Sequence, residues 1–314
     1  MSVRSGYIEL DDGRLAYDEA GNGYPLVLLH GFTVDRQVWD RQFLPLTRTR
    51  RVIRYDLRGF GASSVPGETP YSHVDDLAHL LDELGLDRAD LIGLSLGGGV
   101  AVDFALAHPD RVRGLVLVDP TLGGVPWSVE LLDEFRALNH TAREQGVDAA
   151  RARWLRHPFF AAALEHPGAA ALLNEIEARY SGWHWLHRDP ARALRPPAVE
   201  RLAELQAPTL VIVGERDVPD IRRMAELLAK GIPGASQIVM PGAGHLPNVE
   251  VPKEFNRVLA GFLDRLDAGE ASDGGERRSW VPRQDGSFDC AQDDRGKGEA
   301  DDEDRRRTRM RLVR

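Results

Sequence analysis

A serine stands between closely spaced glycines where an apolar run ends. The run "ADLIGL" ends at Ser95, with Gly93 two positions before the serine and Gly97 two positions after it. A nucleophilic serine needs a sharp strand-to-helix turn that exposes its hydroxyl, and large side chains beside that turn would collide across it. The helix expected at 97–107 would also favour negative charge at its start. We therefore predict that Ser95 is a nucleophile.

A serine hydroxyl is a poor nucleophile, so it requires a base, and the base requires an orienting acid. When the serine stands on a strand-to-helix turn of this kind, the chain order is serine, acid, histidine. Asp217 and His245 follow that order, each just after a strand-like apolar run. We predict that Asp217 orients the imidazole and that His245 accepts the serine proton. Asp119 in "LVDP" also ends such a run and remains an alternative acid.

An acyl transfer also needs backbone N–H groups that bind the oxyanion. Leu96 directly follows the serine and is one expected donor. The other is expected in the loop "LLHGFTVDRQVW", where Phe32 is the candidate. His30 and Gly31 would shape this loop, with His30 as a buried structural histidine.

The sequence offers weak signals for a metal or a nucleotide cofactor. His184 and His187 in "WHWLH" have the spacing of a ligand pair on a helix, but no third ligand is evident nearby. The glycines of "GFGASS" lack the final glycine of a dinucleotide motif. The single cysteine, Cys290, excludes a disulfide within the chain and a cysteine-based metal cluster. We expect no cofactor and no metal.

The elements that must position these residues alternate along the chain. A hairpin is expected around Asp11-Asp12-Gly13. Six runs rich in Val, Ile and Leu are typical of parallel strands buried on both faces. They are 24–31, 51–59, 89–95, 112–120, 207–215 and 236–244, with helix-like segments at 72–85, 97–107, 219–230 and 252–266. This alternation predicts an α/β fold with a mostly parallel sheet and helices on both faces.

One interval, 123–204, breaks the alternation because it contains helix-like segments and no clear strand. We interpret it as a helical cap inserted into a core made of 1–122 and 205–267. Ligands bind beyond the carboxyl ends of the strands in such folds, so the cap would cover the site. Its aromatic residues are candidates for an apolar pocket or for packing between cap helices: Trp127, Trp154, Phe159, Phe160, Trp183 and Trp185.

Charge and composition exclude several classes of partner. The net charge of −9 argues against nucleic acid and anionic membranes. Neither an apolar leader at the N-terminus nor a membrane-spanning apolar run is evident, so we expect a cytoplasmic monomer or weak homo-oligomer. Residues 268–314 end in an acidic block followed by a basic block, and we expect a disordered tail there.

An ordered set of motifs resembles the α/β-hydrolase superfamily over nearly all of 5–266. The motifs are "HGF" (30–32), "YDLRGFGAS" (55–63), "GLSLGG" (93–98), "LVDP" (117–120), "GERD" (214–217) and "GAGH" (242–245). Haloalkane dehalogenases and epoxide hydrolases place Asp where this chain has Ser95, which argues against both reactions. The stretch 214–263 resembles small capped serine esterases and 3-oxoadipate enol-lactonase-like proteins. The resemblance implies an eight-stranded sheet, and neither cofactor nor metal.

These observations predict a serine hydrolase that cleaves a small-molecule carboxylic ester or lactone through an acyl-enzyme. Three alternatives stay open. A hydrolase fold can serve as a small-molecule receptor with little turnover, since fold does not determine function. Carbon–carbon bond hydrolases and cofactor-free haloperoxidases or perhydrolases use the same triad.

Overall fold

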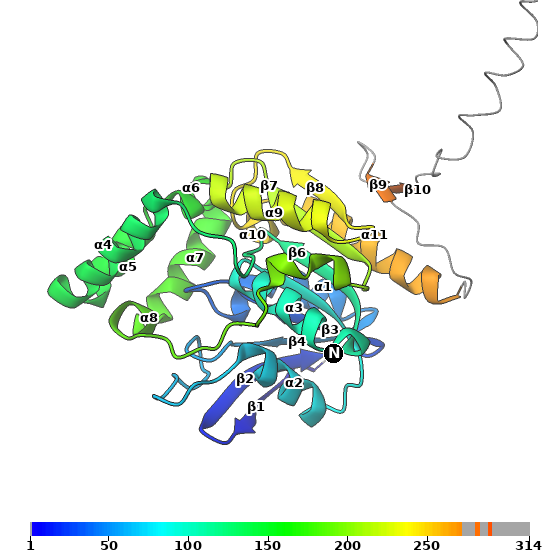
Figure 1. Ribbon diagram of the computed structural model, residues 1–314, viewed down its shortest axis with the longest axis horizontal. Helices are drawn as coiled ribbons and strands as arrows, with labels where there is room; N and C mark the ends of the chain where they lie inside the picture. Colours follow the sequence, from blue (N-terminus) through cyan, green and yellow to red (C-terminus); the bar gives the residue numbers. More distant parts are fainter. Residues whose placement is uncertain (1, 272–279, 283–287, 291–314) are drawn as a thin grey trace, which may run out of the picture.

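The computed structural model of the chain describes residues 2–271, 280–282 and 288–290. Its centre is an eight-stranded sheet in the order β1-β2-β4-β3-β5-β6-β7-β8 (Figure 1). The strands are β1 (Arg4–Leu10), β2 (Gly13–Ala20), β3 (Tyr24–Leu29), β4 (Arg50–Tyr55), β5 (Ala89–Leu94), β6 (Val112–Val118), β7 (Thr209–Gly214) and β8 (Ser236–Met240). The predicted hairpin forms β1 and β2, whose register pairs Leu10 with Gly13. β2 is antiparallel to β4, and the six strands β3 to β8 all run parallel to one another.

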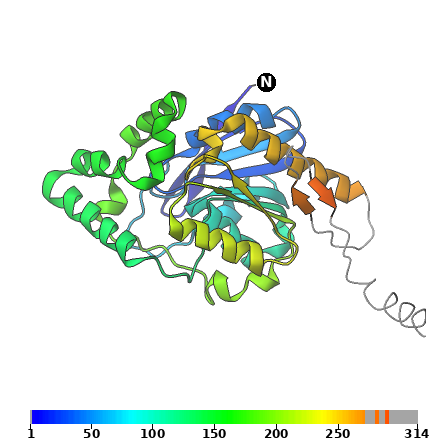
Figure 2. The same ribbon diagram turned by 90° about the horizontal axis from the view of Figure 1, so that it is seen from above.

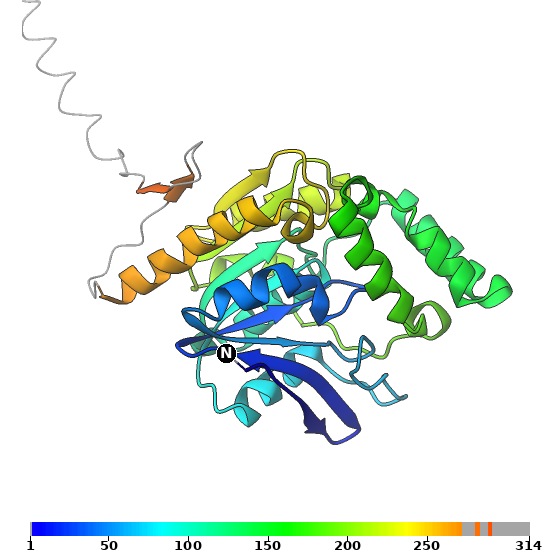
Figure 3. The same ribbon diagram turned by 180° about the vertical axis from the view of Figure 1, so that it is seen from behind.

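The predicted α/β fold is confirmed, and burial explains why the strands form where they do. Every residue of β5, β6 and β7 is buried, as expected for parallel strands covered on both faces. Helices α1 (Asp40–Leu46) and α11 (Pro252–Ala271) cover one face of the sheet (Figure 3). Helices α2 (His73–Glu83), α3 (Leu96–Ala107) and α9 (Pro219–Gly231) cover the other (Figure 1). Short 3₁₀ turns η1 (Arg36–Trp39) and η2 (Pro109–Arg111) lie in the connections.

The interval 123–204 consists of helices and turns between β6 and β7; we call it the cap segment. It contains α4 (Val129–Gln145), α5 (Val147–Trp154), η3 (Pro158–Phe160), α6 (Ala161–Glu165), α7 (Pro167–Arg179), α8 (Trp183–Leu186), η4 (Ala198–Glu200) and η5 (Leu202–Glu204). Helices α4 to α8 gather beside one end of the sheet (Figure 2). All of its residues are described, and none of them belongs to a strand.

The C-terminal region follows β8 through α10 (Pro247–Glu250) and α11. Helix α11 continues to Ala271, and β9 (Trp280–Pro282) pairs antiparallel with β10 (Phe288–Cys290). The rest of the predicted disordered tail lies outside the described residues. Among the helices described, none combines the length and the apolar character that crossing a membrane requires.

Candidate active site

Ser95 occupies a strained turn between β5 and α3. Its backbone has φ 52° and ψ −112°, a conformation that side chains other than glycine rarely adopt. A hydrogen bond of 2.9 Å from the Ser95 N–H to the Val118 carbonyl ties the turn to the end of β6. The serine is 8% exposed and lines a cavity beneath the cap segment. Strain of this kind, held by the surrounding structure, is common at functional sites.

The glycines around the serine allow three backbone segments to approach closely. A Cβ atom on Gly93 would lie 2.3 Å from the carbonyl oxygen of Gly97. A Cβ atom on Gly97 would lie 2.6 Å from the carbonyl oxygens of Leu29 and His30, at the end of β3. The glycines therefore let α3 start directly against the sheet, under the serine.

We expect Gly93→Ala to lower the free energy of unfolding by roughly 1–3 kcal/mol, because the new methyl group overpacks a site bounded by backbone. Urea unfolding followed by circular dichroism measures the change. Gly67→Ala is the matched control, since nothing lies within 4 Å of a Cβ atom at that position. Equal stabilities of the two variants would contradict this explanation of the glycine.

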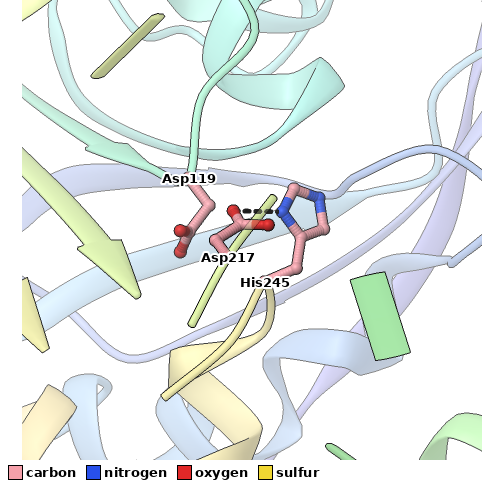
Figure 4. Close-up of side chains that lie close together, drawn as sticks. All are labelled: Asp119, Asp217 and His245. Carbon is pink, nitrogen blue, oxygen red and sulfur yellow. Dashed lines mark hydrogen bonds and ion pairs between the residues drawn. The ribbon is translucent and has the colours of Figure 1, made fainter. Parts of the chain in front are cut away.

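His245 and Asp217 form a buried hydrogen-bonded pair at the carboxyl edge of the sheet. The Nδ1 atom of His245 lies 2.7 Å from Oδ2 of Asp217 (Figure 4). Asp217 follows β7, His245 follows β8, and the two residues are 5% and 6% exposed. The N–H of Val218 donates to Oδ1 of Asp217 at 2.7 Å. A carboxylate beside Nδ1 favours the tautomer whose Nε2 is free to accept a proton.

Asp119, the alternative acid, lies next to Asp217 but is bonded differently. It follows β6 with φ 42° and is fully buried. Its Oδ1 accepts a hydrogen bond of 2.8 Å from the N–H of Gly214. Burial, reinforced by the neighbouring Asp217, raises the pKa of the Asp119 carboxyl well above its usual range. Figure 4 shows that the hydrogen bond of His245 is made to Asp217 and not to Asp119.

The two expected oxyanion donors meet at the same cavity. Leu96 is the first residue of α3, where backbone N–H groups have no partner within the helix. Phe32 follows β3, and within the described part of the chain its N–H makes no hydrogen bond. Both residues line the cavity beside Ser95 and His245.

His30 shapes the loop that carries Phe32. It is fully buried, and the N–H of Leu57 donates to its Nε2 at 2.9 Å. The proton must then reside on Nδ1, which donates to the carbonyl of Gly31 at 2.7 Å. Burial lowers the pKa of this imidazole, so it is a neutral structural histidine.

The cavity above Ser95 has a volume of about 220 Å³ and mostly apolar walls. Four of the six aromatic residues considered from the sequence line it: Trp127, Trp154, Phe159 and Phe160. Phe159 also packs on His245, with ring centroids 4.4 Å apart. Sequence reasoning missed Phe135 of α4, which also lines the cavity. The sequence signal that could have identified Phe135 is its position in the apolar pattern of a helix in the cap segment.

The other two tryptophans and the histidine pair lie away from the cavity. Trp185 is buried and packs edge-on against Tyr180 at 4.9 Å. Trp183 stacks on His187 at 5.2 Å. His184 stacks on Phe60 at 4.3 Å and hydrogen-bonds the Tyr180 hydroxyl at 2.9 Å. His184 therefore packs the cap segment against Phe60 of the core, and His187 packs against Trp183 within the cap segment.

Among the described residues, one group of acids and histidines is close enough to hold a metal ion. It consists of Asp119, Asp217 and His245, whose donor atoms lie within 4.8 Å of one another. The facing atoms of Asp217 and His245 already share a hydrogen bond. A metal there would have to break the pair that orients the imidazole, so the group fits proton transfer better than metal binding.

Comparisons with known proteins identify the family of the chain. Residues 26–258 match the alpha/beta hydrolase family. The chain is 33% identical over 275 residues to the 2-hydroxy-6-oxononadienedioate/2-hydroxy-6-oxononatrienedioate hydrolase 2 of Pseudomonas putida, covering 83% of this chain and 94% of that protein.

Two solved structures are similar in fold and sequence. A thermophilic esterase from Thermogutta terrifontis has a TM-score of 0.69 and 31% identity, covering 84% of this chain and 99% of that one. An enol-lactonase from Burkholderia xenovorans LB400 has a TM-score of 0.71 and 26% identity, covering 82% and 100%. The sheet, the turn at Ser95 and these matches together show that the chain belongs to the alpha/beta hydrolase family.

Proposed function

We propose that this hydrolase cleaves small, uncharged carboxylic esters or lactones, with Ser95 as nucleophile, His245 as base and Asp217 as orienting acid. One observation carries the proposal. Ser95 and His245 line a single apolar cavity, and among the described residues that line it only His245 carries an ionisable side chain. A cavity of this kind accepts an uncharged acyl group and leaves a carboxylate without a partner.

The first half of the reaction forms an acyl-enzyme. Ser95 Oγ attacks the carbonyl carbon while His245 Nε2 takes the hydroxyl proton. The carbonyl oxygen becomes an oxyanion, which the N–H groups of Phe32 and Leu96 would bind. Asp217 stabilises the imidazolium through its hydrogen bond to Nδ1. The bond to the leaving alkoxide then breaks, and His245 returns the proton to that oxygen.

The second half regenerates the enzyme. Water attacks the acyl carbon while His245 accepts one of its protons. The tetrahedral intermediate collapses, Ser95 leaves and recovers the proton from His245, and the free acid departs. Each oxyanion donor is expected to contribute a factor on the order of 10²–10³ in rate.

The similarity to the Pseudomonas putida hydrolase supports carbon–carbon bond cleavage as a second candidate. The name of that protein's substrate denotes a dicarboxylate. The cavity of this chain offers no Lys or Arg among its described lining residues, which favours the uncharged ester. The esterase and the enol-lactonase among the similar structures support ester or lactone hydrolysis as the reaction.

A matched pair of substrates tests the proposal. We expect kcat/KM for p-nitrophenyl butyrate to exceed that for mono-p-nitrophenyl succinate by about 10²-fold or more, because the second acyl chain buries an unpaired carboxylate. Turnover should also decline toward dodecanoate, since the cavity holds about 220 Å³. Preference for the succinate ester would favour the second candidate. Labelling of Ser95 by a fluorophosphonate with negligible turnover of every ester would favour a receptor.

A further inference from the structure

The loop that carries Phe32 is held by a buried hydrogen-bond chain from the cap segment. Thr33, the next residue, has φ 63°, which is strained for a β-branched side chain. Its hydroxyl accepts a hydrogen bond from Nε1 of Trp154 at 2.7 Å. The same hydroxyl donates to Oε1 of Glu177 at 2.6 Å. Trp154 ends α5 and Glu177 lies on α7, so two cap helices fix one side chain of the loop.

A second contact joins the same helix to the same loop. Arg179, two residues beyond Glu177, donates to Oδ2 of Asp35 from Nη2 at 2.9 Å and from Nε at 3.2 Å. Asp35 lies two residues beyond Thr33, so α7 contacts the loop at two positions, through Glu177 at Thr33 and through Arg179 at Asp35. The Phe32 ring of the same loop packs edge-on against Trp154, with ring centroids 6.2 Å apart.

Glu177 is an unusual residue for a helix surface because it is fully buried. Its Oε2 has no hydrogen-bond partner among the described residues. Burial raises the pKa of its carboxyl to about 8, although the Thr33 hydrogen bond and the charge of Arg151 act in the opposite direction. The titratable and charged groups that face it are Arg151 on α5, Asp35 before η1 and Tyr180 after α7.

We propose that Glu177, acting through Thr33, is a positioning residue for the oxyanion hole, so that the Phe32 N–H is aligned only while α7 is seated on the loop. This inference rests on the proposed function, because it assigns the Phe32 N–H to the oxyanion. The cap segment then has a second role besides covering the cavity. While α7 contacts the loop, it holds the strained backbone at Thr33 in the geometry that catalysis requires. A misplacement of about 1 Å at such a donor can cost on the order of 10² in rate.

The hydrogen bond between Thr33 and Glu177 also makes turnover sensitive to pH. Below a pH of about 8 the Glu177 carboxyl is neutral and stays in its buried site. Above it the carboxylate must be solvated, since Oε2 has no partner in the described structure, and α7 is drawn away from the loop. We expect kcat to fall at pH values above about 8 in the wild type. Glu177→Gln keeps an acceptor for Thr33 and cannot ionise, so its kcat should stay level there.

Steady-state kinetics on p-nitrophenyl butyrate at pH 7 separate the variants. We expect Glu177→Leu and Thr33→Val to lower kcat by roughly 10- to 100-fold while KM changes by less than about threefold. Glu177→Gln and Thr33→Ser, which keep the hydrogen bond, should stay within about threefold of the wild-type kcat. Asn174→Leu is the matched control, because Asn174 is an exposed polar residue of the same helix. Its kcat should equal that of the wild type.

A spectroscopic readout reports the contact without turnover. The indole N–H resonance of Trp154, assigned by comparison with Trp154→Phe, should shift with pH near 8 in the wild type and not in Glu177→Gln. Thr33→Val leaves α7 unaltered, so it tests the proposal even if Glu177→Leu folds poorly.

Each failure has its own signature. A wild type that neither turns over esters nor reacts with a fluorophosphonate would overturn the proposed function. An active wild type together with a Thr33→Val variant of unchanged kcat would overturn the positioning role alone. A loss of activity confined to KM would mean that these residues only pack the cap against the core.

Discussion

Ser95→Ala is expected to lower kcat for p-nitrophenyl butyrate by roughly five to six orders of magnitude, the scale reported for removing the nucleophile of a serine triad. The substitution deletes only the Oγ atom, and alanine keeps the Cβ that the strained turn already accommodates. The fold and the cavity should therefore be unchanged. The cavity and the backbone N–H groups of Phe32 and Leu96 would still support a residual rate above that in water.

Stopped assays with high enzyme concentration measure this residual rate, and thermal unfolding verifies that the variant is folded. Ser181→Ala is a suitable control, because Ser181 is exposed and lies outside the residues that line the cavity. It should match the wild type. If Ser95→Ala kept turnover within tenfold of the wild type, the nucleophile would have to be another group, and the proposed acyl-enzyme would be wrong.

Asp217→Asn is expected to lower kcat by about 10⁴-fold, because an amide in that position favours the wrong imidazole tautomer. His245 Nδ1 would then face an N–H donor, and the proton would move to Nε2, the atom that must accept it. Asp119→Asn should cost no more than a few fold. Burial raises the pKa of the Asp119 carboxyl, so an uncharged amide suits this site, and an asparagine oxygen can accept the same hydrogen bond from the Gly214 N–H.

The pair of variants decides between the two acids with one assay. Both substitutions remove a carboxyl and preserve size, so each controls for the other. A large loss in Asp119→Asn with a small loss in Asp217→Asn would identify Asp119 as the triad acid. Comparable large losses would mean that the two carboxyls act as one unit and that Asp119 holds Asp217 in place.

The sheet could be predicted from the sequence because its signals are local. Strands buried on both faces must be apolar throughout, and β5, β6 and β7 appear in the sequence as short runs of Val, Ile and Leu. The glycines around Ser95 mark a turn for a reason that the structure makes explicit, since a Cβ atom on Gly93 would strike the Gly97 carbonyl. Family motifs in a set order then made the fold specific.

The candidate residues of the site were also accessible to sequence reasoning, for a topological reason. Ser95, Asp217 and His245 each follow a parallel strand, and parallel strands bring their carboxyl ends to one edge. The same rule applied to Asp119, so the sequence alone left two acids open. The side-chain geometry separates them, because Asp217 reaches Nδ1 of His245 at 2.7 Å while Asp119 bonds the Gly214 N–H.

The pattern of residue types along the sequence was enough to predict the fold class, the helical interval 123–204 and the small set of residues able to catalyse acyl transfer. Only the tertiary structure decided which cap aromatics line the cavity and which, like Trp185, pack elsewhere. It alone joined Thr33 to Glu177, two residues 144 positions apart. The physical reason is that backbone periodicity and turns depend on neighbours in sequence. Contacts between side chains of different elements depend on how those elements pack, and no local pattern records that packing.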